Sequence, residues 1–338
     1  MTRDRCNMRP KVLLVEPIGD PGMRILREVG VVRILPRRSQ RELIAHIRDA
    51  DAAIIRAMLR IDSQVIDAGR RLKVIGRFGV GLDNVDVKRA TERGIPVVWT
   101  PDANYAAVAD FSFGMMIAIA RRIVSANDAL RQHGSWERRH QLVGTDVSEK
   151  VLGIIGFGRV GRAVAERARG FRMRVLVHDP FIEEEVVSEF GGIPASLEEL
   201  LAQSDFVSIH APYTPETRRL IGDREFNMMK PRAFIINTAR GGIVDSRALV
   251  KALRAKRIAG AALDTFEEEP PRRRNALFRL ENVIATPHIA AFTQESLEKV
   301  SATVAEGVAS ALRNERPRYV FNESVYQTSQ RSHKNELE

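Results

Sequence analysis

Short apolar runs alternate with helical patterns along almost the whole chain, and this alternation limits the fold more than any other feature. Near-continuous apolar runs are typical of parallel strands that helices cover on both faces. Residues 21–29 and 40–50 carry apolar side chains at the spacing of a helix. The first part of the chain is therefore predicted to form one doubly wound α/β domain. Its predicted strands are residues 11–16, 31–35, 52–56, 73–77 and 95–99.

A second series of the same kind begins after a polar, basic segment at residues 125–150. Six predicted strands match the usual size of a dinucleotide-binding sheet. A helical pattern at residues 293–312 follows the last strand, and residues 322–338 are expected to be a polar, disordered tail. The six strands are residues 151–155, 174–179, 205–210, 233–237, 260–264 and 283–286.

The composition excludes several classes of protein. The chain has 338 residues, 44% of them hydrophobic, which is enough for two globular domains. Its single cysteine, Cys6, permits no intramolecular disulfide and no Cys-based zinc site, so we predict a cytoplasmic protein without a metal. Residues 1–11 lack the apolar core of a secretory signal. Residues 111–120 are too short for a membrane span, which needs about 20, and are predicted to form a buried helix.

The net charge of +10 arises from 53 Lys and Arg against 43 Asp and Glu. Such a charge suits nucleic acid, an acidic membrane surface or an anionic small substrate. The basic residues are dispersed, and the sequence carries no helix-turn-helix, zinc-finger or aromatic RNA-binding signature. We therefore predict a small anionic partner, and neither nucleic acid nor membrane.

The first chemical motif is Gly156-Phe157-Gly158-Arg159-Val160-Gly161, between an apolar run and a helical pattern. In such a G-x-G-x-x-G turn the first glycine permits the turn, the second lets the backbone approach a pyrophosphate, and the third packs helix on strand. Asp179 ends the next predicted strand, where a carboxylate accepts hydrogen bonds from a ribose and repels a 2′-phosphate. The motif predicts NAD rather than NADP.

Two further motifs end predicted strands of the same series. In Asn237-Thr238-Ala239-Arg240-Gly241-Gly242, the guanidinium of Arg240 has the fork geometry that suits a carboxylate. In Thr286-Pro287-His288-Ile289-Ala290, small residues follow a histidine that moves protons near neutral pH. Glu269, in the run Glu267-Glu268-Glu269-Pro270, is a carboxylate that could orient this imidazole and favour its charged form.

The three motifs in this order resemble those of the D-isomer-specific 2-hydroxyacid dehydrogenase family, and the resemblance covers residues 11–322. It implies an NAD-dependent oxidoreductase whose catalytic residues are Arg240, Glu269 and His288. Arg240 would hold the carboxylate and carbonyl oxygen of the substrate, and His288 would exchange a proton with the C2 oxygen. Glu269 would orient His288, while NADH passes a hydride to C2.

The same resemblance implies the binding residues. The backbone N–H groups of Val80 and Gly81 would bind the substrate carboxylate, and Asn104 would support their loop. Arg240 also binds substrate. Arg159 and Val160 would contact the pyrophosphate. His210, Ala211, Pro212 and Thr217 would line the adenosine side, and Thr238, Ala239 and Asp264 would face the nicotinamide end. The predicted cofactor residues are Gly156, Gly158, Arg159, Val160, Gly161, Asp179, His210, Ala211, Pro212, Thr217, Thr238, Ala239, Asp264 and Ala290.

The family further implies two doubly wound parallel-sheet domains with the active site between them. The flavodoxin-like substrate domain would be discontinuous, residues 1–100 plus 293–322, and the Rossmann NAD-binding domain would be residues 101–292, followed by the tail at 323–338. Residues 121–140 fall where the family has its dimerisation arm, so a homodimer is predicted. From the length of 338 residues we expect a short form, without the C-terminal regulatory domain of long phosphoglycerate dehydrogenases.

Departures from the family pattern bear on the substrate. Met58 and Leu59 occupy a loop that helps relatives bind phosphate, which disfavours phosphoglycerate, although Arg60 could compensate. Glu269 argues against formate oxidation, because those relatives carry Gln. Asp110 replaces a usual Glu, and Ser246-Arg247 a common Glu, both outside the predicted chemistry. The main prediction is a reductase of glyoxylate or hydroxypyruvate type. Its alternatives are D-3-phosphoglycerate dehydrogenase and a non-enzymatic NAD-sensing corepressor; the physiological substrate and direction stay open.

Overall fold

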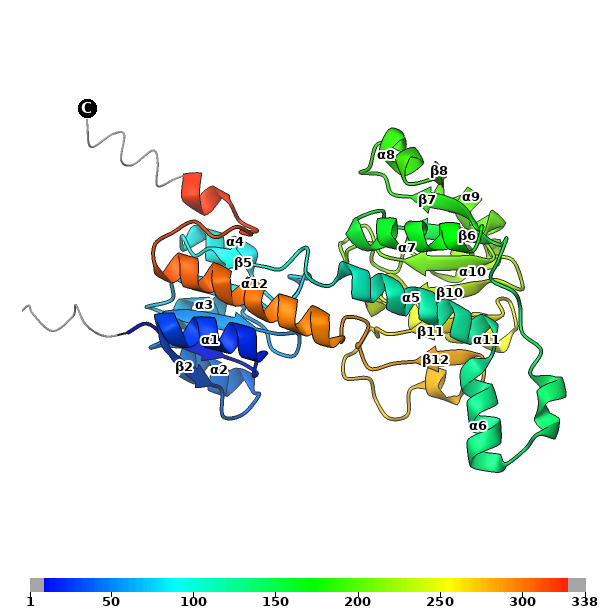
Figure 1. Cartoon of the computed structure of the whole chain (residues 1–338), viewed down its shortest axis with the longest axis horizontal. Coiled ribbons are helices and arrows are strands. Elements are labelled where there is room, and N and C mark those ends of the chain that lie inside the picture. Colours follow the sequence, from blue (N-terminus) through cyan, green and yellow to red (C-terminus); the bar gives the residue numbers. More distant parts are fainter. Residues whose placement is uncertain (1–8, 328–338) are drawn as a thin grey trace, which may run out of the picture. The chain divides into compact units, whose positions relative to one another are not determined.

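A computed structural model describes residues 9–327, which fold as two compact units. Unit 1 comprises the described residues up to Asn104 and those from Phe292 onward, and unit 2 comprises Tyr105–Ala291. In each unit helices cover both faces of a sheet (Figure 1). Cys6 and the start of the chain, for which no secretory signal is predicted, lie outside the described residues.

The sheet of unit 1 has five parallel strands in the order β2-β1-β3-β4-β5. This is the flavodoxin-like order, so the predicted fold class is confirmed. All five predicted strands are present, with shorter ends. Their bounds are β1 Lys11–Leu14, β2 Val31–Ile34, β3 Ala52–Ile55, β4 Val74–Arg77 and β5 Val97–Val98. The helices are α1 Asp20–Val29, α2 Gln40–Ile47, α3 Ser63–Ala68, α4 Val87–Glu92 and α12 Gln294–Leu312.

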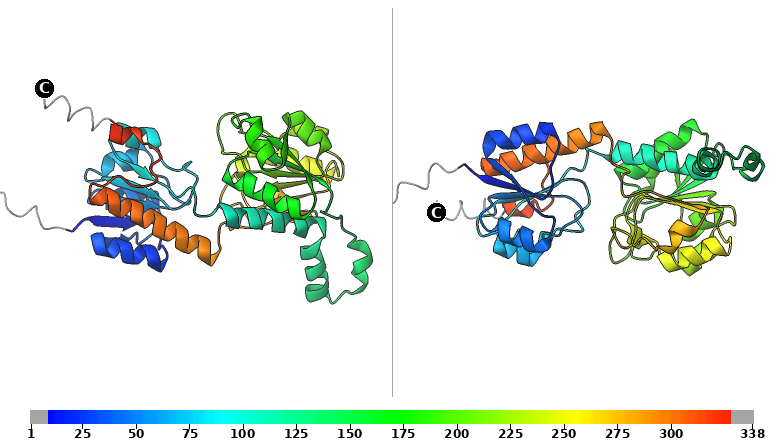
Figure 2. Two further views of the ribbon diagram at one scale, coloured as in Figure 1. Left: turned by 45° about the horizontal axis from the view of Figure 1, so that its top comes forward. Right: turned by 90° about the horizontal axis from the view of Figure 1, so that it is seen from below.

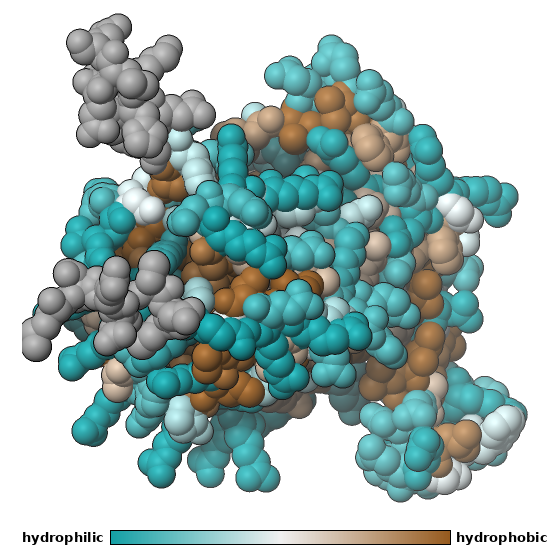
Figure 3. All heavy atoms as spheres, turned by 60° about the vertical axis from the view of Figure 1, so that its left-hand side comes forward, coloured by the Kyte–Doolittle hydropathy of each residue, from teal (hydrophilic) through white to brown (hydrophobic). Residues whose placement is uncertain are grey.

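The central strands of this sheet are buried on both faces, as near-continuous apolar runs require, whereas the edge strand β2 is largely exposed. Ala53 and Ile55 of β3 pack into one hydrophobic cluster, whereas Ala52 and Ile54 pack into the other. Surface positions are mainly hydrophilic, and exposed apolar residues lie in separate patches on the face shown in Figure 3. The apolar side chains of the strands thus build two layers of core, one on each side of the sheet.

Helix α12 returns from the end of the chain to pack beside α1 in unit 1 (Figure 2). Gly22 makes the close approach possible, because a Cβ there would overlap the backbone of Ser301. The Ser301 hydroxyl donates to Gly19 O at 2.9 Å and accepts from Gly22 N at 3.2 Å. Two distant parts of the sequence therefore form one hydrophobic layer.

The prediction of a disordered tail from residue 322 is wrong at its start. Val320 bridges antiparallel to Val98 of β5, and Phe321 N donates to Val97 O at 2.9 Å. Asn322 is only 7% exposed; its Oδ1 accepts from Val97 N, and its amide donates to Ile95 O. A polar residue satisfied in this way belongs to the fold. The predicted tail at 328–338 lies outside the described residues.

Unit 2 contains a seven-stranded parallel sheet in the order β12-β11-β10-β9-β6-β7-β8. The six predicted strands are present, but the sequence prediction missed β8, a three-residue edge strand containing Pro194. Proline is tolerated at such an edge. The strands are β6 Val151–Ile155, β7 Arg174–His178, β8 Gly192–Pro194, β9 Phe206–Ile209, β10 Phe234–Asn237, β11 Gly260–Leu263 and β12 Val283–Ala285. The helices include α5 Tyr105–Ala120, α7 Arg159–Gly170, α8 Glu184–Glu189, α9 Leu197–Gln203, α10 Asp223–Met228 and α11 Ser246–Arg254, with the 3-10 turns η2 Gly241–Ile243 and η3 Ala276–Arg279.

Residues 125–150 do not separate the two strand series as a linker. They lie inside unit 2 and contain most of α6 Ile123–His133 and the 3-10 helix η1 Glu137–Gln141, which project from the rest of the unit (Figure 1). The apolar stretch at 111–120 is confirmed as a buried part of α5. Within residues 9–327 none of the helices combines the length and apolarity that crossing a bilayer demands.

Candidate functional site

The glycine motif forms the turn between β6 and α7. Gly156 has φ +89°, a conformation that favours glycine, and a Cβ there would overlap the backbone of Ala211. A Cβ on Gly161 would overlap the carbonyl oxygen of Gly156. Two of the three motif glycines are thus required by the packing of this turn.

Gly158 differs, because a Cβ there would meet nothing within 4 Å. It is the N-cap of α7, whose first N–H groups lack partners within the helix. A helix N-terminus that opens into free space next to a glycine is a site for an anion such as a pyrophosphate. The turn therefore fits the phosphates of a dinucleotide.

Asp179 follows β7, the neighbour of β6 in the sheet. Its Oδ2 accepts from Phe157 N at 2.7 Å, and its Oδ1 accepts from Phe181 N at 3.0 Å. The first bond ties the carboxylate to the glycine turn, beside the expected phosphates. A fixed anion here suits a ribose and opposes a 2′-phosphate.

The residues after β9 lie on the other side of the glycine turn. Burial lowers the pKa of His210 to about 3, so the ring is neutral, and its Nε2 lies 2.8 Å from Ser208 Oγ. The Thr217 hydroxyl donates to Pro212 O at 2.6 Å and accepts from Thr214 N. The Thr217 side chain thus stabilises the loop of residues 212–217. The assignment of Thr217 to the adenosine side stays a prediction.

The loop that carries Arg240 follows β10 and is held by Asn237. The Asn237 amide donates to Arg240 O at 2.9 Å, and its Oδ1 accepts from Ala239 N at 3.0 Å. Gly241 comes so close to Phe266 that a Cβ would overlap the Phe266 backbone. The glycine after Arg240 thus lets this loop lie against the segment that leads to Glu269.

Glu269 and His288 form a hydrogen-bonded pair, with Oε2 2.7 Å from Nδ1. An ionised carboxylate only accepts, so Nδ1 carries the proton and Nε2 is left for exchange with a ligand. Burial raises the pKa of Glu269, but the hydrogen bond and charge of His288, the N–H of Phe266 and the charge of Arg240 outweigh it and lower the pKa. The three predicted catalytic residues are thus brought together in unit 2.

Asp264 positions residues 286–290, the histidine loop that carries His288. This carboxylate is fully buried and accepts from Thr286 Oγ1 at 2.5 Å, Ile289 N at 3.0 Å and Ala290 N at 2.8 Å. His288 N also donates to Asp264 O. His288 has φ +55°, which is uncommon outside glycine and is held here by these bonds. The sequence prediction placed Asp264 and Ala290 at the cofactor and missed this role.

Val80, Gly81 and Asn104 belong to unit 1, whereas the three predicted catalytic residues belong to unit 2. Val80 and Gly81 follow β4, and within residues 9–327 neither of their backbone N–H groups donates to another group. Two such donors in one loop suit a carboxylate ligand. Their assignment to the substrate stays a prediction.

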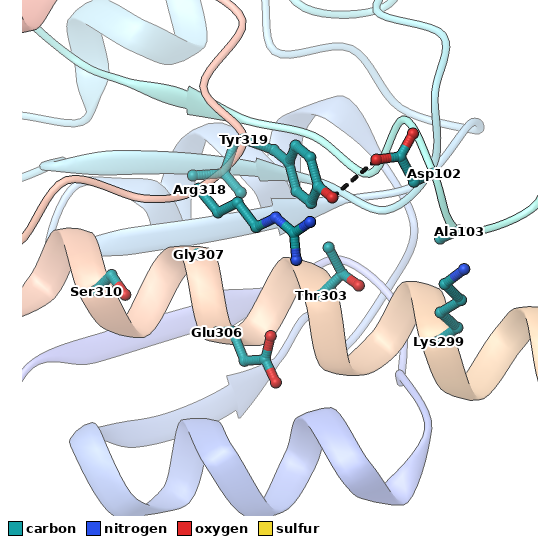
Figure 4. A pocket seen from close by; sticks show the side chains of 10 residues that line it. Asp102, Ala103, Lys299, Thr303, Glu306, Gly307, Ser310, Arg318 and Tyr319 are labelled. Carbon is teal, nitrogen blue, oxygen red and sulfur yellow. Dashed lines mark hydrogen bonds between the residues drawn. The ribbon is translucent and has the colours of Figure 1, made fainter. Parts of the chain in front are cut away.

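A cavity of about 260 Å³ in unit 1 contains none of the predicted site residues. Lys299 and Arg318 face it together with Thr303, while Tyr319 Oη donates to Asp102 Oδ2 at 2.8 Å on its rim (Figure 4). Glu306 on α12 also lines it, so its charges are mixed. The glycine turn and the catalytic residues form a different site in unit 2.

Comparison with known proteins identifies this arrangement. Residues 113–290, which span the glycine turn, Arg240, Glu269 and His288, match the sequence model of the "D-isomer specific 2-hydroxyacid dehydrogenase, NAD binding domain". The chain belongs to the D-isomer specific 2-hydroxyacid dehydrogenase family. The sequence resemblance is confirmed, and the Rossmann-type sheet of unit 2 is the nicotinamide-cofactor domain of that family.

Relatives within the family cover nearly the whole chain. A glyoxylate reductase of Thermococcus gammatolerans is 44% identical over 94% of this chain and 97% of its own length. A D-3-phosphoglycerate dehydrogenase of Methanocaldococcus jannaschii is 42% identical over 92% of this chain, which spans only 59% of that protein. The crystal structure of a glyoxylate reductase from Paecilomyes thermophila has a TM-score of 0.85 at 30% identity, covering 93% of this chain and 99% of that one.

Proposed function

We propose that this protein is an NAD-dependent oxidoreductase that interconverts a small D-2-hydroxy acid and its 2-keto acid. The observation that carries the proposal is the pair of Glu269 and His288 next to Arg240, in a unit with a dinucleotide-binding turn. A proton carrier, a carboxylate-binding cation and a cofactor turn are the parts that such a reaction needs.

Each catalytic side chain has one task. Arg240 donates to the carboxylate and polarises the carbonyl oxygen of a 2-keto acid. His288 gives its Nε2 proton to the C2 oxygen during reduction and takes it back during oxidation. Glu269 holds the ring through Nδ1, so the same nitrogen always faces the substrate. When bound, the nicotinamide supplies the hydride that adds to C2.

The substrate is proposed to be of the glyoxylate or hydroxypyruvate type. Met58, at the centre of the loop after β3, is 60% exposed, and its apolar side chain offers no donor to a phosphate. The full-length match to glyoxylate reductases supports this choice. D-3-phosphoglycerate is the second candidate, supported by similar identity to dehydrogenases that are longer than this chain.

The cofactor is proposed to be NAD, because Asp179 stands beside the glycine turn. A second copy of the chain is the proposed partner, in the cytoplasm, and α6 with the segment after it is the proposed contact. This segment exposes Leu130, Trp136 and Val143 by 52%, 61% and 77%, which is a large apolar area for a solvated surface. Light scattering on a size-exclusion column tests the dimer, and Trp136→Glu should shift it toward monomer.

A substrate panel tests the function. Glyoxylate, hydroxypyruvate, phosphohydroxypyruvate, pyruvate and bulkier 2-keto acids are each mixed with NADH, and its absorbance is followed. We expect the highest kcat/KM with glyoxylate or hydroxypyruvate. Highest efficiency with phosphohydroxypyruvate would move the assignment to phosphoglycerate. If no substrate of the panel is reduced although the protein binds NADH, the alternative of an NAD-sensing corepressor is favoured instead.

A further inference from the structure

Ser112 is a polar residue on the buried side of the largely apolar helix α5, and it contacts the loop of the catalytic arginine. Its side chain is fully buried, and its Oγ lies 2.7 Å from the Oγ1 of Thr238. The same Oγ lies 2.7 Å from Val108 O in the preceding turn of the helix. Thr238 is 6% exposed and stands two positions before Arg240.

The directions of these two hydrogen bonds follow from the atoms involved. A carbonyl oxygen only accepts, so the single hydroxyl proton of Ser112 goes to Val108 O. The contact between the two hydroxyls then needs the proton of Thr238, which donates to Ser112 Oγ. Thr238 Oγ1 keeps its lone pairs and has no proton left. Toward a ligand it is an acceptor only.

The place of Thr238 in the sheet indicates which part of a dinucleotide it meets. Asp179, on the ribose side, follows β7, and the pyrophosphate turn follows β6. A dinucleotide lies across the carboxyl ends of the strands, so its second nucleotide extends the other way, over β9, β10 and β11. Thr238 follows β10, in the half that takes the nicotinamide.

The neighbours of Thr238 on the adjacent strand also present an acceptor. Asp264 follows β11, and Asp264 N donates to Asn237 O at 2.9 Å. Its side chain is a carboxylate, which has no proton to donate when ionised. Beside Thr238 Oγ1, the end of β11 therefore adds an acceptor and no donor, and this carboxylate is itself fully buried and accepts from Thr286, Ile289 and Ala290.

We propose that Ser112 is a positioning residue that fixes Thr238 as a hydrogen-bond acceptor, so that this end of the site selects a pyridine ring bearing an amide N–H donor. The proposal rests on the proposed cofactor. Ser112 itself touches no ligand and acts only through the hydroxyl proton of Thr238, which it accepts. The selected chemistry is the carboxamide of nicotinamide, as opposed to an acetyl group of the same shape that lacks the N–H.

The test compares the affinities of two reduced cofactors, measured by fluorescence titration without substrate. One is NADH, and the other is its 3-acetylpyridine analogue, in which a methyl group replaces the amide nitrogen. Wild type should bind NADH more tightly. In Ser112→Ala the Thr238 proton is released and can serve the acetyl oxygen, so the preference should fall by about three- to tenfold, the range of one hydrogen bond.

Two variants separate the proton argument from a general loss of structure. Ser112→Thr keeps the hydroxyl and should keep the preference, whereas Thr238→Val removes the acceptor and should lose it as Ser112→Ala does. The double variant should lose no more than either single one. An unchanged preference in Ser112→Ala or Thr238→Val, with NADH bound, overturns the proposal alone. Failure of wild type to bind NADH overturns the proposed function and this proposal together.

Discussion

Glu269 lies between His288 and the loop of Arg240, with one carboxylate oxygen for each side. Its Oε2 is 2.7 Å from His288 Nδ1, and its Oε1 accepts from Phe266 N at 3.0 Å, where the backbone of Phe266 presses against Gly241. One carboxylate thus connects the histidine to the segment that supports the arginine.

Replacing His288 should stop the chemistry and spare the cofactor. His288→Ala removes the proton carrier, and we expect kcat to fall by a factor of about 10² to 10⁴. The dissociation constant of NADH should stay within about twofold, because the glycine turn is intact. Steady-state kinetics and fluorescence titration check this. A fall in kcat of less than about tenfold would exclude His288 as the general acid.

The pair of Glu269 and His288 should make stability depend on pH. The pKa of Glu269 is lowered in the folded protein, so its contribution is present above the unfolded value and is lost as the pH falls through the folded value. The urea midpoint of wild type should therefore drop on acidification below about pH 4.5. Glu269→Gln lacks this contribution at every pH, and its profile should be flatter. Parallel profiles would contradict the prediction.

Asp264 should matter for stability as well as for activity. Asp264→Asn turns one of its two acceptor oxygens into a donor that faces N–H or O–H groups, in a fully buried place. Losing bonds to a buried charge costs about 1.5 to 3 kcal/mol each, so we expect at least that loss in the free energy of unfolding. Urea denaturation measures it. The same substitution at an exposed position in a loop, Asp146→Asn, serves as the control and should change stability by less than about 0.5 kcal/mol.

The glycines of the cofactor turn should separate binding from folding. Gly158→Ala adds a methyl group in open space, so the protein should fold as stably as wild type and bind NADH more weakly. Gly161→Ala forces an overlap with the Gly156 carbonyl and should lower the melting temperature. Differential scanning calorimetry with NADH titration compares the two. An unchanged melting temperature of Gly161→Ala would contradict the claim that the packing of the turn requires a glycine at this position.

Asp179 should set the choice between the two nicotinamide cofactors. Asp179→Ala removes the carboxylate that opposes a 2′-phosphate, so kcat/KM with NADPH should rise relative to NADH. The same change removes the acceptor of Phe157 N, which should weaken NADH as well. The measurement is the ratio of the two efficiencies. Equal efficiency of wild type with both cofactors would remove this role of Asp179.

Much of the fold was predictable because parallel α/β sheets mark their strands clearly. Residues 151–155 form a strand with the predicted bounds, since an apolar run before a glycine turn leaves little choice. The edge strand β8 was missed because three residues containing Pro194 carry no strand pattern. The sequence around Asn322 predicts a tail, because the partner of its side chain, Val97 N, is 225 positions away.

The same division holds for the site. Motif residues such as Gly156, Arg240 and His288 are visible in the sequence because each residue type has a chemical reason to stand at a strand end. Ser112 is not visible, since a serine in an apolar helix shows no partner until the helix is packed. Asp264 is visible only as an acid after a strand, and its three donors come from a loop more than 20 residues later.

The sequence by itself determined the two α/β sheets, the dinucleotide turn and the residue types of the catalytic set. The tertiary structure alone decided which of these side chains share protons: Glu269 with His288, Asp264 with the histidine loop, and Ser112 with Thr238, 126 positions apart. The physical reason is the sequence distance over which each signal acts. Strand and helix patterns reflect burial, which repeats along the chain, whereas a hydrogen bond depends on a few tenths of an ångström between atoms that only the packed sheet brings together.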